Sequence, residues 1–369
     1  MVTENLAKFI EKQGIPSSDV IIYHNHKEIF RYHCGFKDAD RSIPLKGSEL
    51  YFLYSATKVI TCTAAMRLVE KGIISIDDPV GKSLPAYNNL FYKSGNEIRK
   101  CQNTMKIRHL FAMRGGLSYD FGTPPIRKVF ENNPDAGTVE VVNAFAETPL
   151  LFEPGTDYNY SLCHDVLGAV IEVASGMKFG DFLKKEIFDP LGMADTTFDF
   201  ENADKSRFAT LYNLSQDKYI PAPLRCAYIL GKNYQSGGAG LISTVNDYVL
   251  FSDALACNGT AYNGYRVLRP ETVDLMRSNQ NETKYPGGNK PGYGYGFGVR
   301  TMLNPAAAQS DAPTDFEFGW DGAAGTYVGI DPYHHLTCVY AQHVLGHGWV
   351  YTDVHPVIRD TMYKIAGII

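Results

Sequence analysis

The sequence of 369 residues lacks a long apolar run, an excess of positive charge and paired cysteine motifs. No apolar stretch is long enough to cross a bilayer. Lys and Arg number 35 against 40 Asp and Glu, so the formal charge is -5, which argues against a broad nucleic-acid surface. The seven cysteines are scattered without a CxxC pair, which favours reduced thiols. The N-terminal segment has no basic stretch followed by an apolar one, so we expect a cytoplasmic protein.

Several well-known catalytic and binding motifs are also missing. The sequence contains no GxSxG elbow, no GxxxxGK[ST] loop and no HExxH pair. His343 and His347 have the spacing of helical metal ligands, but they lie where a strand and glycines are predicted. His24 and His26 fall in a predicted hairpin turn. We therefore expect neither a metal ion nor an organic cofactor.

Strand patterns occur near both ends of the chain, and helical periodicity dominates the middle. This order predicts an α/β protein of the α+β type. A central antiparallel sheet would take strands from both termini and carry flanking helices, with an inserted, mostly helical lobe. The predicted strands are residues 20–23, 29–32, 293–300, 325–330 and 336–343, and the predicted helices are 6–12, 55–69, 107–113, 139–145, 161–174, 179–188 and 354–365.

The same pattern predicts the domain organisation. Residues 1–50 and 235–369 would form the sheet lobe, and residues 51–234 the helical lobe. Clefts between lobes are the usual place for a small-molecule site. We therefore expect the active site at this junction. Thr138 is expected to cap the helix that starts after it.

A Ser-x-x-Lys pattern is the main chemical signal. It occurs three times, beginning at Ser55, Ser175 and Ser215, but only Ser55 opens a clear helical pattern. In a helix, Lys58 would lie on the same face as Ser55, one turn later. The start of a helix also favours negative charge that develops near the serine. Ser55 is thus either a nucleophile assisted by Lys58 or a simple helix cap.

The surrounding segments resemble the serine β-lactamase and penicillin-binding-protein superfamily, in its class C β-lactamase-like form. The segment LYSATKVITCTAAMRLVEKGIISIDDPVGKSLP resembles the nucleophile helix and the stretch after it. Five further segments match in order, so that the resemblance spans about residues 5–365. These segments are IRHLFAMRGGL, FEPGTDYNYSLCHDVLGAVIEVASG, IFDPLGMADTTF, SGGAGLISTVNDYVLF and FGWDGAAGTYVGIDP.

The resemblance implies a role for each matching residue. Ser55 would be the nucleophile, Lys58 its partner and Tyr160 the tyrosine of the family's Tyr-x-Asn motif. The backbone N–H groups of Ser55 and Ala323 would form the oxyanion hole. Either Lys58 or Tyr160 could act as the base, and coupled titration leaves this choice open. Tyr119 and Tyr234 lie close to matching motifs and either line the cleft or pack in the core.

The chain departs from the family pattern at the third motif. Trp320, Asp321 and Gly322 stand where the family has Lys-Thr-Gly or His-x-Gly, and Leu162 replaces the asparagine of Tyr-x-Asn. Trp320 removes the cation that usually holds a substrate carboxylate. Gly322 allows close backbone approach. Asp321 would repel anionic substrates, recognise a cationic group or point to solvent.

A tryptophan at this position is typical of the family VIII carboxylesterases. The resemblance therefore implies a serine hydrolase that cleaves small-molecule esters or amides through an acyl-enzyme, most simply a carboxylesterase. A β-lactamase or D-amino-acid peptidase on the same scaffold is one alternative. An acyltransferase is another, and an inactive binding module is a third. Neither a nucleic acid nor a membrane is expected as a partner.

Overall fold

The computed structural model describes residues 1–281 and 290–369. Within them, the main feature is a seven-stranded sheet with the order β2-β1-β13-β12-β11-β10-β9, whose neighbouring strands are all antiparallel. The predicted α+β fold class is confirmed. The strands are β1 (Ser17–His24), β2 (Lys27–Gly35), β9 (Tyr293–Tyr295), β10 (Arg300–Met302), β11 (Phe318–Asp321), β12 (Tyr327–Asp331) and β13 (Leu336–Ala341).

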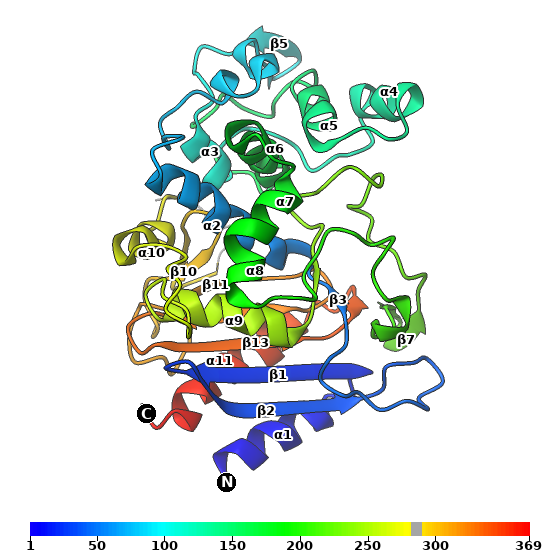
Figure 1. Cartoon of the computed structure of the whole chain (residues 1–369), viewed down its shortest axis with the longest axis vertical. Helices are drawn as coiled ribbons and strands as arrows, with labels where there is room; N and C mark the ends of the chain where they lie inside the picture. The colour runs from blue at the N-terminus through cyan, green and yellow to red at the C-terminus, as the bar shows by residue number, and fades with distance from the viewer. Residues whose placement is uncertain (282–289) are drawn as a thin grey trace.

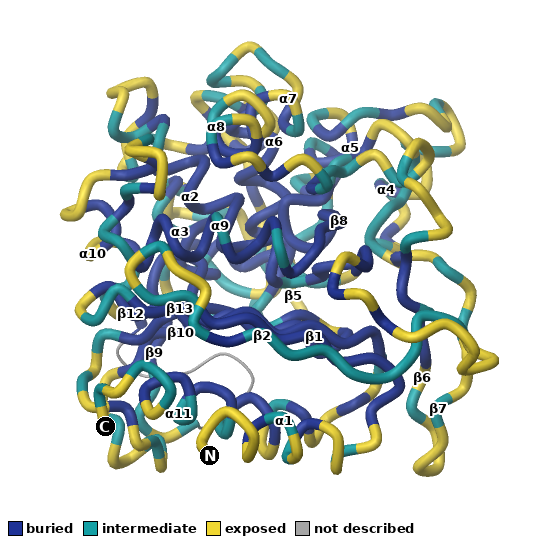
Figure 2. The backbone as a smooth tube through the Cα atoms, turned by 60° about the horizontal axis from the view of Figure 1, so that its bottom comes forward, coloured by how far each residue is buried: buried dark blue, intermediate teal, exposed yellow. Residues whose placement is uncertain are grey.

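Within this sheet, the N-terminal strand β1 lies next to the C-terminal strand β13. β1 pairs with β13, with Asp19 opposite Ala341 and His24 opposite Leu336 (Figure 1). Every residue of β12 and β13 is buried, so the centre of the sheet is covered on both faces (Figure 2). A sheet covered on both faces holds its strands in one register, since a slip would expose apolar side chains. The division into two lobes at residues 50 and 235 stays a prediction.

Helices cover the two faces of the sheet. On one face, α9 (Val245–Ala256) packs against β1, β12 and β13. On the other, α11 (His355–Ile365) packs against β13, and α1 (Val2–Lys12) contacts α11 and β2. Both chain termini lie on the side of α1 and α11 (Figures 1 and 2). Each helix buries its apolar stripe, as amphipathic helices do.

The helix α2 (Thr57–Glu70) occupies the centre of the molecule between α6 (Cys163–Ser175) and β11. Its residues from Thr57 to Met66 are all buried, and a single 3-10 turn, η1 (Tyr54–Ala56), precedes it. The remaining α-helices are α3 (Ile107–Phe111), α4 (Pro124–Asn132), α5 (Thr138–Phe145), α7 (Phe179–Leu183), α8 (Asp189–Leu191) and α10 (Pro270–Arg277).

Smaller strands and turns complete the described part of the chain. The minor strands are β3 (Tyr51–Phe52), β4 (Phe91–Ser94), β5 (Glu97–Lys100), β6 (Tyr212–Ser215), β7 (Lys218–Pro221), β8 (Ile242–Ser243) and β14 (Val344–Leu345). The short helical turns are η2 (Val80–Lys82), η3 (Pro85–Asn88), η4 (Lys184–Phe188), η5 (Lys205–Arg207) and η6 (Val350–Val354). Among the described residues, none of the helices has both the length and the apolar character needed to cross a bilayer.

Two local predictions are wrong. Residues 293–300 do not form one strand: β9 and β10 pair antiparallel around a turn that contains Gly298, whose φ is +79°. A Cβ at Gly298 would lie 2.2 Å from Cys62 Sγ, so the turn approaches α2 closely. Thr138 is the first residue of α5 rather than its cap, and its hydroxyl accepts a hydrogen bond from Gln235 N–H at 3.0 Å. The expected helix 179–188 is helical throughout, with α7 continuing as the π-helical turn η4.

Candidate active site

Ser55 lies in the tight turn that leads into α2. Tyr54 before it has a left-handed φ of +46°, which is unusual for a residue with a bulky side chain. The Leu53 N–H donates to Leu241 O at 2.9 Å, and the Ala56 N–H donates to Leu53 O at 3.2 Å. The turn therefore holds the half-buried Ser55 at the N-terminal end of a buried helix.

Lys58 follows one turn later and is completely buried. Its Nζ lies 3.2 Å from Ser55 Oγ, 3.3 Å from the Tyr119 hydroxyl and 2.6 Å from Gly238 O. Burial lowers the pKa of Lys58 to about 7, although the Asp165 carboxylate acts in the opposite direction. A large share of Lys58 is therefore uncharged at neutral pH, with a lone pair that can accept the Ser55 proton.

Asp165, on α6, is the buried carboxylate that acts on Lys58. The hydroxyls of Tyr234 and Ser236 donate to its Oδ1 at 2.7 and 2.6 Å. Burial raises the pKa of Asp165 above its usual value, against these two donors and Lys58. The sequence analysis missed Asp165, because an aspartate inside a helical pattern gives no sign of which helix it faces.

Three aromatic rings form a stack beside Ser55. The ring of Tyr160 lies between Tyr119, at 5.6 Å and 17°, and Trp320, at 5.7 Å and 28°. Trp320 Nε1–H donates to the Tyr160 hydroxyl at 3.2 Å, and Lys58 Nζ lies 4.6 Å from the centre of the Tyr160 ring. Burial raises the pKa of Tyr160 despite its hydrogen bonds to Ser55 and Trp320. Tyr160 therefore keeps its proton at neutral pH.

The turn after β11 approaches Ser55 from the other side. The Gly322 N–H donates to Thr326 O at 2.7 Å, and the Gly325 N–H donates to Gly322 O at 2.8 Å. A Cβ on Gly322 would lie 2.4 Å from Leu53 O, so only glycine permits this approach to the segment before Ser55. Ala323 is exposed at the tip of the turn, which we call the 321–325 turn.

Asp321 is one of the expected substrate-binding residues, but its carboxylate does not point to solvent. Its Oδ2 lies 2.9 Å from Arg300 Nη1, and its Oδ1 lies 3.2 Å from His355 Nδ1. Burial alone would raise the pKa of Asp321, but Arg300 and His355 more than offset this effect and hold the pKa well below its usual range. Both carboxylate oxygens are thus bound by cationic or donor side chains of the protein.

These elements enclose a cavity of about 270 Å³. Six of the seven site residues predicted from the sequence line this cavity. The seventh, Lys58, lies directly behind Ser55. Among the described residues that line it there is neither a lysine nor an arginine. The lining residues are Ser55, Tyr160, Trp320, Asp321, Gly322, Ala323 and, as a residue that the sequence analysis missed, Tyr351.

Comparison with known proteins identifies the family. The family model described as "Beta-lactamase" matches residues 2–360. This chain belongs to the β-lactamase family. The members of this family that it resembles include the esterase EstB of Burkholderia gladioli, which is 30% identical over 319 residues, covering 78% of this chain and 76% of EstB.

Solved structures agree with this assignment at the level of the fold. EstCE1, described as a hydrolase with promiscuous acyltransferase activity, superposes with a TM-score of 0.79 at 24% identity, covering 98% of this chain and 97% of EstCE1. An octameric penicillin-binding protein homologue from Pyrococcus abyssi gives a TM-score of 0.73 at 22% identity, covering 100% and 77%. The resemblance to the β-lactamase and penicillin-binding-protein superfamily is confirmed, and with it a family of serine hydrolases.

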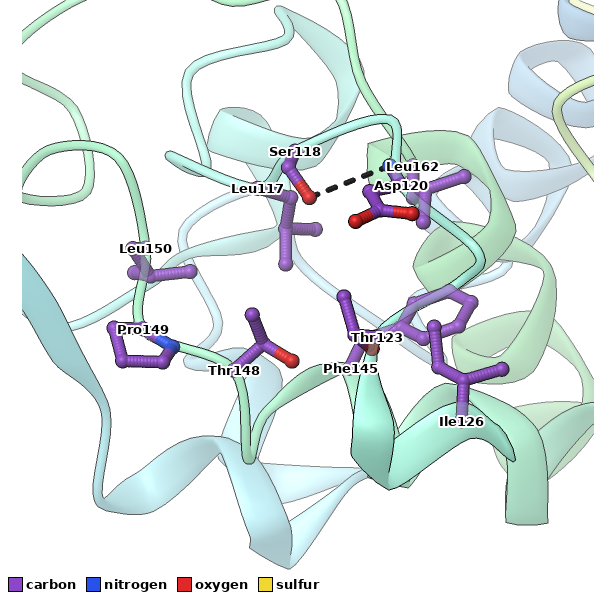
Figure 3. A pocket seen from close by; sticks show the side chains of 10 residues that line it. All are labelled: Leu117, Ser118, Asp120, Thr123, Ile126, Phe145, Thr148, Pro149, Leu150 and Leu162. Carbon is purple, nitrogen blue, oxygen red and sulfur yellow. Dashed lines mark hydrogen bonds between the residues drawn. The ribbon is translucent and has the colours of Figure 1, made fainter. Parts of the chain in front are cut away.

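Leu162, the second departure from the pattern of this β-lactamase family, lies away from the Ser55 cavity. It lines a separate small hollow together with Leu117, Ser118 and Asp120 (Figure 3). This hollow has a volume of about 10 Å³, which leaves room for about one water molecule and excludes a substrate. Of the two departures, only Trp320 therefore changes the surface that a substrate would meet.

The histidine pairs do not form metal sites within the described residues of this β-lactamase-family chain. His343 accepts the Phe52 N–H on Nε2 at 3.3 Å and donates to Ala209 O through Nδ1 at 2.8 Å. His347 Nδ1 contacts the Gln342 amide at 2.8 Å. The donor atoms of one trio, His26, Asp253 and Cys257, do lie within 4.8 Å of one another. In this trio the Asp253 carboxylate already binds the ring and backbone N–H of His26.

Proposed function

We propose that this chain is an esterase that cleaves small, uncharged carboxylic esters through an acyl-enzyme on Ser55. The observation that carries the proposal is the buried Lys58, 3.2 Å from Ser55 Oγ, at the base of an aromatic cavity that no lysine or arginine lines among the described residues. The similarity to EstB, which is named an esterase, supports it.

In the first step, Ser55 attacks the ester carbonyl while its proton passes to the neutral amine of Lys58. If two N–H groups of neutral Lys58 donate to Gly238 O and the Tyr119 hydroxyl, the lone pair is left to face Ser55. The oxygen of the tetrahedral intermediate accepts hydrogen bonds from the N–H groups of Ser55 and Ala323. This assigns the base, left open by the sequence, to Lys58, because Tyr160 retains its proton.

In the second step, the intermediate collapses, the C–O bond to the alcohol breaks, and the alkoxide takes a proton. The protonated Lys58 or the Tyr160 hydroxyl beside it supplies that proton. Water then gives up a proton along the same path, attacks the acyl group and releases the acid and Ser55. Trp320 and Tyr119 hold the Tyr160 ring in place by stacking.

The cavity disfavours the substrates of β-lactamases and D-amino-acid peptidases, which carry a carboxylate. A carboxylate held in an apolar cavity needs a cation or several donors. Trp320 occupies the position of the usual cation, and it is buried. Arg300, the basic residue bound to Asp321, also pairs with Glu317 at 3.0 Å.

A comparison of substrate classes tests the proposal. We expect hydrolysis of p-nitrophenyl acetate and butyrate with a kcat/KM well above that for a chromogenic cephalosporin. Ser55→Ala should lower ester hydrolysis by about 10⁴-fold or more. Ser215→Ala is the matched control, because Ser215 begins another Ser-x-x-Lys pattern but is exposed on β6.

Three outcomes would contradict the proposal. A higher kcat/KM for the cephalosporin would favour the lactamase alternative. Ester products formed in preference to acid, when a short alcohol is added, would favour acyl transfer, the activity named for EstCE1. Failure of a fluorophosphonate to label Ser55 would favour an inactive binding module.

A further inference from the structure

His355, the first residue of α11, lies beneath the 321–325 turn. Its Nδ1 is 3.2 Å from Asp321 Oδ1, and its Nε2 is 3.1 Å from Gly325 O. The imidazole is therefore bound to both ends of the turn that carries Ala323. Its side chain is only 4% exposed, so water does not substitute for either contact.

Both partners of the His355 ring are acceptors. The carbonyl of Gly325 has no proton to offer, and Asp321 is ionised because Arg300 also binds it. A neutral imidazole has one N–H and one bare nitrogen, and the bare nitrogen would face an acceptor at hydrogen-bond distance. Only the doubly protonated ring satisfies both contacts, and an unmet contact of this kind is costly when it is buried.

We infer that His355 is an imidazolium that donates a hydrogen bond to each end of the 321–325 turn. These two bonds position the Ala323 N–H toward the oxyanion. The inference rests on the proposed acyl-enzyme function in so far as it concerns catalysis. His355 itself contacts neither substrate nor Ser55, so it is a positioning residue.

A second contact from the same segment acts on the same turn. The Tyr351 hydroxyl, in η6 just before α11, donates to Gly322 O at 2.9 Å and lies 3.1 Å from Ala323 O. Its ring packs edge-on to His355 at 5.3 Å. The segment from Tyr351 to His355 therefore holds the turn at its ends and at its centre.

Aromatic rings and charged groups of both signs surround the His355 ring. The Tyr327 ring lies 4.9 Å from the His355 ring at 30°, and aromatic faces attract cations. Tyr340 contributes an edge contact at 5.8 Å. The titratable or charged groups that face His355 or its Asp321 partner from the neighbouring elements are Asp321, Arg300, Lys290, Tyr327, Tyr340, Tyr351 and His347.

The protonation of His355 can be measured without any substrate. We would label the histidine rings with ¹⁵N and assign the His355 signals by their loss in His355→Gln. At the pH of the ester assay, both His355 nitrogens should carry a proton and give imidazolium shifts. A neutral tautomer, with one protonated and one bare nitrogen, would overturn the inference.

The positioning role is tested by separating kcat from KM. In His355→Gln, which cannot donate from two opposite sides, kcat for a p-nitrophenyl ester should fall about tenfold while KM changes less than about twofold, since oxyanion contacts act on the transition state. His334→Gln is the matched control, because His334 also bonds an aspartate, Asp331, at the other end of β12.

The outcomes of the two measurements are distinct. A kcat in His355→Gln equal to that of His334→Gln, or an effect on KM alone, would overturn the positioning role. Absence of ester hydrolysis in the wild type would overturn the proposed function instead. In that case the ¹⁵N spectrum still shows whether both nitrogens of His355 are protonated and can donate to the two ends of the turn.

Discussion

Lys58 lies among groups that change its proton affinity in opposite directions. Complete burial lowers the pKa of Lys58, and the Asp165 carboxylate raises it, with a net value of about 7. If burial acted alone, the amine would be too weak a base to take the Ser55 proton. With the balance seen here, the base form and a useful basicity coexist near neutral pH, which is the condition that general-base catalysis needs.

The first prediction concerns the pH dependence of ester hydrolysis. In the proposed mechanism neutral Lys58 is the base, so kcat/KM should rise with pH, reach half its maximum near pH 7 and level off above it. Asp165→Asn removes a negative charge that favours protonated Lys58. The pKa of Lys58 should then fall, and the rising limb should move to lower pH.

Tyr234→Phe is the control for that change. It removes a hydroxyl donor to Asp165 but leaves the carboxylate charge in place. Its pH profile should therefore stay closer to that of the wild type than the profile of Asp165→Asn. A rising limb in Asp165→Asn that does not move, or that moves to higher pH, would contradict the assignment of Lys58 as the base.

At the residue scale, the sequence predicted the site residues that lie in recognisable motifs. It did not predict the site residues that only tertiary packing brings close to Lys58. Ser55, Lys58 and Tyr160 stand in recognisable patterns, and the structure places them together. Gly238 O accepts a hydrogen bond from Lys58, and the Asp165 carboxylate acts on Lys58 electrostatically, only because α6 and the loop before β8 fold against α2. No local pattern encodes such a contact, which depends on the tertiary structure.

At the scale of elements, the proposed oxyanion site depends on the distance between two turns. One turn, η1, carries Ser55, and the 321–325 turn carries Ala323. Gly322 lies at the point where they touch, with its missing side chain directed at Leu53 O. The gap between the two oxyanion donors is therefore fixed by backbone contact.

The second prediction tests this contact. A Cβ at Gly322 would lie 2.4 Å from a backbone oxygen, so Gly322→Ala must push the turns apart. We expect kcat/KM for p-nitrophenyl esters to fall by about 10²-fold, the loss found when one oxyanion donor is removed. Gly348→Ala is the control, because a Cβ there meets no atom within 4 Å. Equal activity of the two variants would contradict this account.

Helices and strands were predicted well where the hydrophobic pattern was long. They were predicted poorly where a glycine fitted a strand pattern but formed a turn. Each predicted helix corresponds to a helix of the structure, and the strands β1, β2, β12 and β13 were found, but α4, α9, α10 and β11 were not predicted. The alternating glycines of residues 293–300 satisfied a strand pattern, yet Gly298 turns the chain back on itself. Periodicity alone does not distinguish a glycine that packs closely in a strand from one that reverses the chain.

At the scale of the molecule, the sheet joins the two ends of the chain through β1 and β13. Ile22, in β1, is fully buried opposite Cys338, in the apolar cluster beneath α1 and α11. The third prediction is that Ile22→Ala lowers the free energy of unfolding by about 2–5 kcal/mol, measured by urea denaturation.

The exposed Ile220 on β7 provides the matched control for stability. Ile220→Ala should change the free energy of unfolding by less than about 0.5 kcal/mol. KM for an ester should be unchanged in both variants, because neither residue lines the Ser55 cavity. A loss in Ile22→Ala as small as that in Ile220→Ala would show that the β1–β13 junction contributes little to stability.

The pairing of β1 with β13 also sets the order in which the protein becomes active during its synthesis. Ser55, Lys58 and Tyr160 leave the ribosome long before β11 and the 321–325 turn. Until β13 emerges, β1 has an unpaired edge, and closing this non-local pairing is a slow kind of folding step. The nascent chain thus contains the proposed nucleophile early but lacks Ala323, the proposed second oxyanion donor, so we expect ester cleavage to begin only after translation of the last third of the chain.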